Sequence, residues 1–281
     1  MNFTRLLKRT NAAFVERFGG QRVVFHHVPK CGGTSAGRAL RTAYLLSQAT
    51  VTPEESFKAF KLLTERDDRD QMLIDVLPYR DVMFMYLLYS DVRCVSAHVR
   101  FRNQAFDAFH DRYRFVTVLR EPVDRFISHY FWSHNRPQAH GHIPDDFETF
   151  LNSERARRVG ATYAEYFSGL ANDVPVDSRE SIEASIANLN RMDVVGFLDD
   201  VPSFEEQLKT RLSRTVRIGH TNKGKSPGKQ REILNGPHRD RILELCAPDR
   251  AIWDAVQHLR QPQRIESATV KNSKPATVSL D

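Results

Sequence analysis

The chain has 281 residues, of which 41% are hydrophobic, which is enough to bury the core of one large domain. Its formal net charge of +6 at pH 7 favours an anionic ligand or acceptor, although no motif points to nucleic acid. The three cysteines, Cys31, Cys94 and Cys246, are widely spaced, so the sequence indicates neither a disulfide framework nor a zinc cluster, and a cytoplasmic, reducing location is expected.

The first 18 residues mix basic and apolar side chains at helical spacing. They include no long apolar core, so we predict neither a secretory signal nor a membrane anchor. A helix over about residues 1–19 that packs on the domain is expected, with peripheral contact to a membrane surface as the alternative. The longest apolar run, residues 82–89, is too short to span a bilayer.

A strand, a glycine turn and a helix are predicted at residues 23–47. Residues 23–27 are apolar and rich in β-branched side chains, which is typical of a strand, and a helix is expected over residues 35–47. Glycines between the two let the backbone approach an anion, and the first amides of a helix are unpaired donors. The candidate anion-binding loop consists of Pro29, Lys30, Cys31, Gly32, Gly33, Thr34 and Ser35.

The remaining elements alternate between helices and strands. In the first half we predict a helix at 53–65, helical structure at 66–91 interrupted at Pro78, a strand at 92–96, an amphipathic segment at 104–110, a strand at 113–119 and a helix from Pro122. In the second half we predict short helices over 145–189 with a break at 173–177, a strand at 193–197, a helix from Pro202, a further strand at 216–218, helices at 229–246 and 248–259, and a disordered tail at 261–281.

This alternation predicts an α/β fold, with a mostly parallel sheet flanked by helices and a helical C-terminal part. Residues 1–260 are expected to form a single domain. Ligands of such folds bind at the carboxyl ends of the strands. The most polar strand ends, at residues 29–35, 96–101 and 120–128, are therefore expected to meet in one crevice.

A second candidate anion site combines Arg120 and Ser128. Arg120 leaves its predicted strand as a rigid fork of donors, and Ser128 presents a hydroxyl two turns into the next helix. Such a pair suits a terminal phosphate. The alternative is that Arg120 forms an ion pair with Glu121 or Asp124 and that Ser128 lies on an ordinary helix face.

The order of residues in the loop separates it from the loop of nucleoside triphosphatases, because Lys30 precedes the glycines instead of following them. Pro-Lys-x-Gly-Gly-Thr-Ser resembles the 5′-phosphosulfate loop of sulfotransferases that use 3′-phosphoadenosine 5′-phosphosulfate, PAPS. Arg120 and Ser128, with Pro122 between them, resemble the pair by which these enzymes recognise the 3′-phosphate. The resemblance implies a P-loop-like sulfotransferase fold, PAPS as the sulfuryl donor and no metal.

Residues 96–101, Ser-Ala-His-Val-Arg-Phe, resemble the Gly-His-Val-x-Phe segment of the heparan sulfate and chondroitin uronyl 2-O-sulfotransferases. Residues 194–200 resemble the Val-Gly strand of the same group, so the resemblance covers about residues 22–225. It implies that His98 is the catalytic base. Ser96 stands where that group has a second histidine. The alternative for His98 is a strand-end histidine that pairs with a neighbouring group.

Further candidates lie in two groups. The loop at 219–225 resembles the one that closes over PAPS in several sulfotransferases, which implies that Lys223 and Lys225 approach the nucleotide phosphates; an exposed turn is the alternative. Among the other histidines, His26 and His27 are expected to pack in the protein. Those that could line an acceptor cleft are His129, His134, His140 and His142; the alternative is that they are solvated loop histidines.

Taken with the resemblance, the motifs predict transfer of a sulfuryl group from PAPS to a hydroxyl of a carbohydrate or glycolipid, with Lys30 stabilising the departing 5′-phosphate. A nucleotide-dependent kinase of similar fold is one alternative. The position of Lys30 and the lack of a magnesium-binding aspartate after a strand argue against it. A non-catalytic polyanion-binding module is another, and the presence of both His98 and Lys30 argues against that.

Overall fold

The computed structural model describes residues 20–219 and 233–272, and only the backbone of residues 261–272. The predicted N-terminal helix at about residues 1–19 therefore lies outside the described residues, as do Lys223 and Lys225. Of the helices described, none is both long and apolar enough to cross a membrane.

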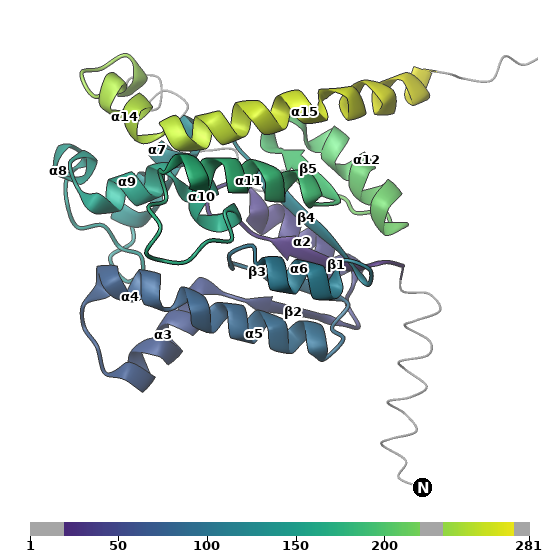
Figure 1. Cartoon of the computed structure of the whole chain (residues 1–281), viewed down its shortest axis with the longest axis horizontal. Coiled ribbons are helices and arrows are strands. Elements are labelled where there is room, and N and C mark those ends of the chain that lie inside the picture. Colours follow the sequence, from purple (N-terminus) through teal and green to yellow (C-terminus); the bar gives the residue numbers. More distant parts are fainter. Residues whose placement is uncertain (1–19, 220–232, 273–281) are drawn as a thin grey trace, which may run out of the picture.

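Five parallel strands form one sheet in the order β2-β3-β1-β4-β5 (Figure 1). The predicted α/β architecture is confirmed. The strands are β1 (Arg22–His26), β2 (Gln48–Val51), β3 (Cys94–Ala97), β4 (Tyr113–Leu119) and β5 (Val194–Phe197). The central position of β1 is expected for its sequence, because a strand covered on both faces must be continuously apolar, and Val23, Val24 and Phe25 are fully buried.

One strand was missed, and one predicted strand is absent. The edge strand β2 was missed because its residues are polar or half-exposed, apart from Val51, and so carry no apolar run. Residues 216–218 form no strand. The amide of Ile218 donates to the carboxylate of Glu205 instead of to a neighbouring strand, so this segment is held by a helix side chain.

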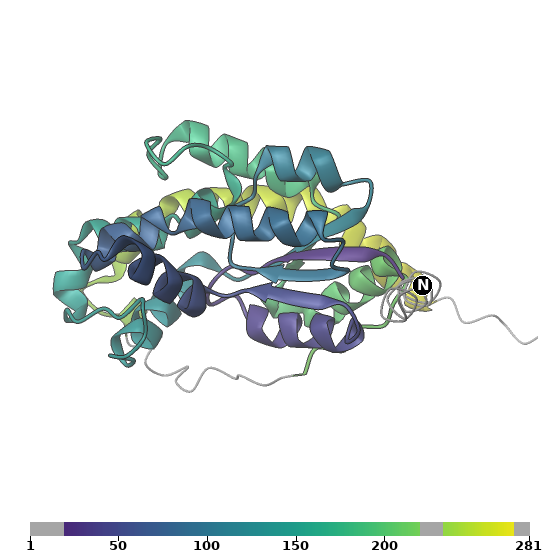
Figure 2. The same ribbon diagram turned by 90° about the horizontal axis from the view of Figure 1, so that it is seen from below.

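The helices of the first half follow the predicted order. They are α2 (Gly33–Ala43), α3 (Pro53–Thr64), α4 (Arg69–Asp75), α5 (Leu77–Tyr89), α6 (Asn103–Phe109) and α7 (Pro122–His134). The expected interruption at Pro78 is displaced, because Pro78 lies in the first turn of α5, where a missing amide costs nothing, and the break falls at Val76. Figure 2 shows α2 on one face of the sheet and α5 on the other.

The helices of the second half are α8 (Phe147–Leu151), α9 (Glu154–Gly160), α10 (Thr162–Phe167), α11 (Arg179–Arg191), α12 (Val201–Leu212), α14 (Arg239–Leu245) and α15 (Ala247–Asn272). The predicted break at 173–177 lies between α10 and α11. Helix α15 continues to Asn272 instead of ending near Leu259, so residues 261–272 are helical where a tail was expected. Their polar composition suggested disorder, but Gln, Arg, Glu, Ala and Lys are also good helix formers.

A buried ion pair ties α7 to α15. The guanidinium of Arg125 lies 3.3 Å from the carboxylate of Asp249, and both side chains are 0% exposed. Asp249 also accepts hydrogen bonds from the backbone amides of Tyr163 (2.8 Å) and Ala164 (3.3 Å), which lie in α10. Burial raises the pKa of Asp249, and the positive charge of Arg125 opposes that rise. One carboxylate thus joins three helices behind the carboxyl end of β4.

Candidate active site

The loop after β1 turns sharply into α2. Lys30 and Gly32 both adopt left-handed backbone conformations, with φ of 66° and 73°, and Gly32 is the residue that precedes the helix. A Cβ at Gly32 would lie 2.5 Å from Cδ1 of Leu198, so any other residue would have to displace that side chain as well as adopt a strained backbone conformation. Left-handed residues within a short loop make the concave backbone nests that bind anions, and the unpaired amides of α2 follow directly. Along this loop, Pro29 and Ser35 are half-buried, Cys31 and Gly33 are buried, and Thr34 is exposed.

Three cationic side chains gather at this loop. The ammonium of Lys30 lies 5.1 Å from the centre of the Trp132 ring, and the guanidinium of Arg136 lies 4.7 Å from the same centre. Burial, together with the positive charges of Arg136 and Arg120, lowers the pKa of Lys30 to about 8. Since like charges repel, an anion bound among these three side chains would reduce their electrostatic repulsion. Trp132 and Arg136 were not singled out from the sequence.

Arg120 directly follows β4. Because β4 pairs with β1 in parallel, Arg120 lies beside the loop that follows β1. Its guanidinium is 3.6 Å from Asp124, so the ion pair considered from the sequence is present, but Asp124 is well exposed. Ser128, one turn beyond Asp124 on α7, is half-buried, and its hydroxyl makes no hydrogen bond within the part of the chain that the structure describes. A single contact of 3.6 Å to a partly exposed carboxylate is weak, which leaves the Arg120 donors available to a ligand.

Tyr163 holds the two anion-binding segments together. Its hydroxyl accepts a hydrogen bond from the amide of Arg120 (2.8 Å) and donates one to the carbonyl of the same residue. The Sγ of Cys31 lies 3.5 Å from the same hydroxyl. Tyr163 is fully buried, so this contact fixes the main chain of both segments. No sequence signal pointed to it, because it lies 132 residues from Cys31 along the chain.

His98 follows β3 on the other side of β1. Its amide donates to the carbonyl of Val51 (3.2 Å), and its Nδ1 is buried without a hydrogen-bond partner among the described residues. Burial lowers the pKa of His98 well below the usual 6.5, and the charges of His27, Arg80 and His140 lower it further. The imidazole is therefore neutral at pH 7, which is the form that can accept a proton.

The ring of His27 lies against that of His98, with 3.9 Å between the ring centres. This contact follows from the sheet register, because His26 pairs with Ala97 and the next residue of each strand must then lie side by side. A Cβ at Gly33 would lie 2.1 Å from the His27 ring, so this glycine makes room for it. We expected His27 only to pack. It instead places a second histidine beside His98, where Ser96 is buried in the strand.

The other histidines divide between three environments. His26 packs among four phenylalanine rings, as expected, and burial lowers its pKa to about 4. His134 and His142 face the backbone carbonyls of Ile143 and Ser133, each at 3.1 Å, and so stabilise their own loop. The two remaining candidates for an acceptor cleft are His129 and His140.

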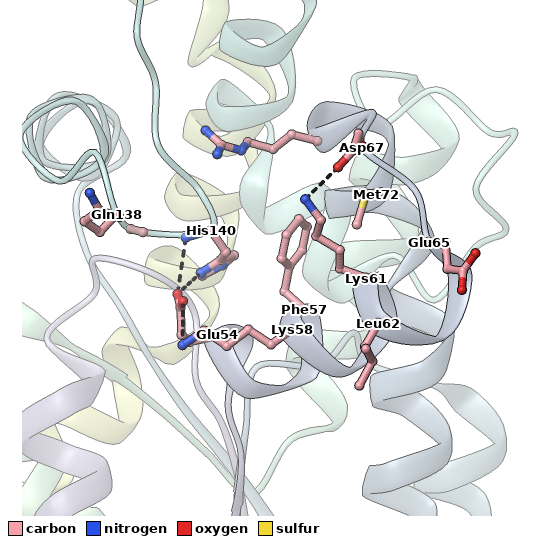
Figure 3. A pocket seen from close by; sticks show the side chains of 12 residues that line it. Glu54, Phe57, Lys58, Lys61, Leu62, Glu65, Asp67, Met72, Gln138 and His140 are labelled. Atoms are coloured by element: carbon pink, nitrogen blue, oxygen red, sulfur yellow. Dashed lines mark hydrogen bonds and ion pairs between the residues drawn. The ribbon is translucent and has the colours of Figure 1, made fainter.

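His129 and His140 are the two whose surroundings connect them to the predicted site, because the charge of Lys30 acts on His129 and that of His140 acts on His98. Burial lowers the pKa of His129 well below its usual value, and the charges of Arg125, Arg155, Lys30 and His140 add to that effect. His140 shares a hydrogen bond of 2.7 Å with the carboxylate of Glu54 (Figure 3). Among residues 20–219 and 233–260, no group of three or more His, Cys, Asp or Glu side chains is arranged to hold a metal ion.

Comparison with known proteins places the chain in a family. A family model described as the sulfotransferase family matches residues 17–261, which is most of the chain. A search of curated proteins found no match. The matched range includes the motifs around Lys30 and Arg120, and the description of the family names no acceptor. The chain therefore belongs to the sulfotransferase family, and its chemistry is sulfuryl transfer.

Proposed function

We propose that the protein transfers the sulfuryl group of PAPS to a hydroxyl of a carbohydrate, with His98 as the general base. The strand order carries this proposal. The loop after β1 lies between Arg120 at the end of β4 and His98 at the end of β3. Anion-binding groups and a neutral imidazole thus flank one loop, as transfer from an anionic donor to a hydroxyl requires.

The residues present fit the donor. PAPS has two anionic ends, and the chain offers two anion-binding segments that Tyr163 joins. Lys30 and the amides of the loop would hold the 5′-phosphosulfate, and Arg120 with the uncommitted hydroxyl of Ser128 would hold the 3′-phosphate. When bound, PAPS supplies the sulfuryl group. Lys30 then stabilises the negative charge that develops on the 5′-phosphate side.

His98 takes the proton of the acceptor hydroxyl in this mechanism. An alcohol must lose its proton as its oxygen bonds to sulfur, and a positioned imidazole that is neutral at pH 7 can accept it. The His27 ring holds His98 in place, since Nδ1 of His98 has no hydrogen bond in the described residues to do so. His27 is in this view a positioning residue.

Ligand binding and turnover test the proposal together. Calorimetry should show that the protein binds adenosine 3′,5′-bisphosphate more tightly than ADP with magnesium; the reverse preference would favour the kinase alternative. Radiolabelled PAPS should pass its label to a member of a panel of hydroxyl acceptors. Tight binding of the bisphosphate without turnover on any acceptor would leave the polyanion-binding module as the better description.

Replacing Lys30 by alanine is expected to lower kcat by about 10²-fold, and to lower it more than it raises the KM for PAPS, because the charge matters most as the bridging oxygen leaves. Since the pKa of Lys30 is about 8, kcat/KM of the wild type should fall as pH rises through that value. Lys30→Arg keeps the charge at all pH values and should lose this alkaline limb. An unchanged kcat in Lys30→Ala would move the role to Lys223 or Lys225.

Replacing Arg120 by alanine is expected to weaken binding of adenosine 3′,5′-bisphosphate by about 1.5–3 kcal/mol, the usual range for hydrogen bonds to a charged group. Binding of AMP, which lacks the 3′-phosphate, should change little. Ser128→Ala is the matched variant and should cost roughly 0.5–1.5 kcal/mol in the same assay. Calorimetry that found equal losses for both nucleotides would contradict the assignment of the 3′-phosphate site.

A further inference from the structure

Helix α7 carries a row of side chains beside the loop after β1. Ser128 and Trp132 are four residues apart on the helix, and Arg136 follows after four more, just beyond its end at His134. Residues at this spacing lie on one face, about 6 Å apart along the helix axis. The middle of the row faces Lys30, because the Lys30 ammonium lies 5.1 Å from the centre of the Trp132 ring.

The main chain fixes Arg136 at the end of α7. Its amide donates to the carbonyl of Ser133 (3.4 Å), and its own carbonyl accepts the amide hydrogen of Ala139 (3.0 Å). The side chain turns back over the helix, since its guanidinium lies 4.7 Å from the centre of the Trp132 ring. Lys30 and Arg136 therefore lie against the same ring, although both are positively charged.

Neither of these two cations has an acidic partner within residues 20–219 and 233–260. The nearby guanidinium of Arg125, by contrast, is paired with Asp249. The faces of the Trp132 ring attract a cation, but less strongly than a hydrogen-bonded anion does. After burial, the charge of Arg136 is the largest contribution that lowers the pKa of Lys30. The pair is therefore suited to an anionic group of a ligand.

The order of these groups along α7 matches the order of groups along the proposed donor. PAPS carries a 3′-phosphate, then a 5′-phosphate, and then the sulfuryl group at its end. Arg120 and Ser128, which would hold the 3′-phosphate, lie at one end of the row. Lys30, which would hold the 5′-phosphate with the loop amides, lies opposite Trp132 in the middle. Arg136, at the other end, is left for the sulfuryl group.

We propose that Arg136 binds the terminal sulfuryl oxygens of the donor, and that the Trp132 ring positions Arg136 and Lys30 for it. This inference rests on the proposed function and adds one donor-binding residue and one positioning residue to its site. A guanidinium suits a sulfuryl group, because its planar fork can donate two parallel hydrogen bonds to two oxygens. Arg136 keeps this contact during transfer, since the sulfuryl oxygens carry negative charge throughout, as the oxygens of a transferred phosphoryl group do.

Calorimetry with two ligands that differ only in the sulfuryl group tests the role of Arg136. The full-length protein is used without an acceptor. Arg136→Gln should weaken binding of PAPS by at least about 10-fold, as expected for a lost charge-assisted hydrogen bond, and change that of adenosine 3′,5′-bisphosphate by less than about 2-fold. Arg120→Ala should weaken both ligands. Arg179→Gln removes the charge of an exposed arginine on α11 and should change neither.

Fluorescence and a conservative variant test the role of Trp132. The chain has two tryptophans, and the other, Trp253, is buried against Phe197. Binding of PAPS should change the emission of the wild type as the two cations leave the ring for the ligand, and Trp132→Phe should lose this change. Trp132→Phe keeps an aromatic face, so it should bind PAPS nearly as tightly as the wild type, whereas Trp132→Ala should bind it about 5-fold more weakly. Adenosine, which has no anionic group, should leave the emission unchanged.

Two sets of results would overturn the inference. Equal losses for PAPS and the bisphosphate in Arg136→Gln, or no loss for either, would remove the sulfuryl contact. An emission change with adenosine alone would show that the Trp132 ring contacts the base instead of positioning the cations. Failure of the proposed function is distinguishable from both, because the wild-type protein would then bind neither PAPS nor the bisphosphate.

Discussion

Replacing His98 by alanine is expected to lower turnover by roughly 10²- to 10⁴-fold, the usual contribution of a general base. The affinity for adenosine 3′,5′-bisphosphate should stay nearly unchanged, because the donor is held by segments after β1 and β4. The pH dependence is a second readout. Since the pKa of His98 is well below 6.5, kcat/KM of the wild type should be flat from neutral pH down to about 6.5 and fall only in more acidic solution. The activity should therefore fall at a lower pH than it would with a histidine of ordinary pKa.

Two variants separate this role from simple packing. His110→Ala removes a histidine at the end of α6 and should leave both turnover and its pH profile unchanged. His27→Phe keeps an aromatic ring against His98 and should retain most activity, whereas His27→Ala should lower kcat without changing bisphosphate affinity. If His98→Ala retained the acid limb and His27→Ala lost it, His27 would be the base. Unfolding of His98→Ala would favour a structural role.

Replacing Asp249 by alanine is expected to lower the free energy of unfolding by about 3–5 kcal/mol, the range found when one partner of a buried ion pair is removed. The loss has two sources. Arg125 remains fully buried with its charge uncompensated, and the backbone amides of Tyr163 and Ala164 lose their acceptor. Urea unfolding followed by circular dichroism measures the change. The dependence of the free energy on urea concentration should be the same for both proteins, which shows that the variant has not changed the surface exposed on unfolding.

The double variant Arg125→Met with Asp249→Leu is the matched control. Removing both charges at once replaces the pair by apolar groups, so it should recover the part of the loss that comes from the uncompensated charge of Arg125, but not the part that comes from the amides of Tyr163 and Ala164. The single variant should also weaken binding of adenosine 3′,5′-bisphosphate, because Tyr163 positions Arg120 and Cys31. A free energy of unfolding within 1 kcal/mol of the wild type would contradict the buried arrangement.

The central part of the fold could be predicted from the sequence because its signals are local. β1 and β4 are rich in apolar and β-branched residues, which predicts strands. Pro53 and Pro122 lie at the first position of their helices, where proline is favoured. β2 could not be predicted, since an edge strand needs no apolar run on its exposed face. The extent of α15 was missed because a polar helix and a disordered tail share the same composition.

The residues of the candidate site also divide into those that the sequence could predict and those that it could not. Lys30, Arg120 and His98 stand in motifs, so they could be named from the sequence. Tyr163, Glu54 and the His27 ring contact could not, because their roles come from contacts between residues that are distant along the chain: Cys31 and Tyr163 are 132 positions apart, and Glu54 and His140 are 86 apart.

The ion pair between Arg125 and Asp249 also has a consequence for how the protein is made. A ribosome delivers the glycine loop early and Asp249 more than two hundred residues later, and all neighbouring strands of the parallel sheet that contact β1 lie far from it in sequence. Contacts between residues so far apart in sequence slow folding, because the entropic cost of closing a large loop comes before the stabilising contacts form. We expect nascent chains that end before Asp249 to lack a stable bisphosphate site, so that the donor-binding half of the site, although encoded first, is completed last.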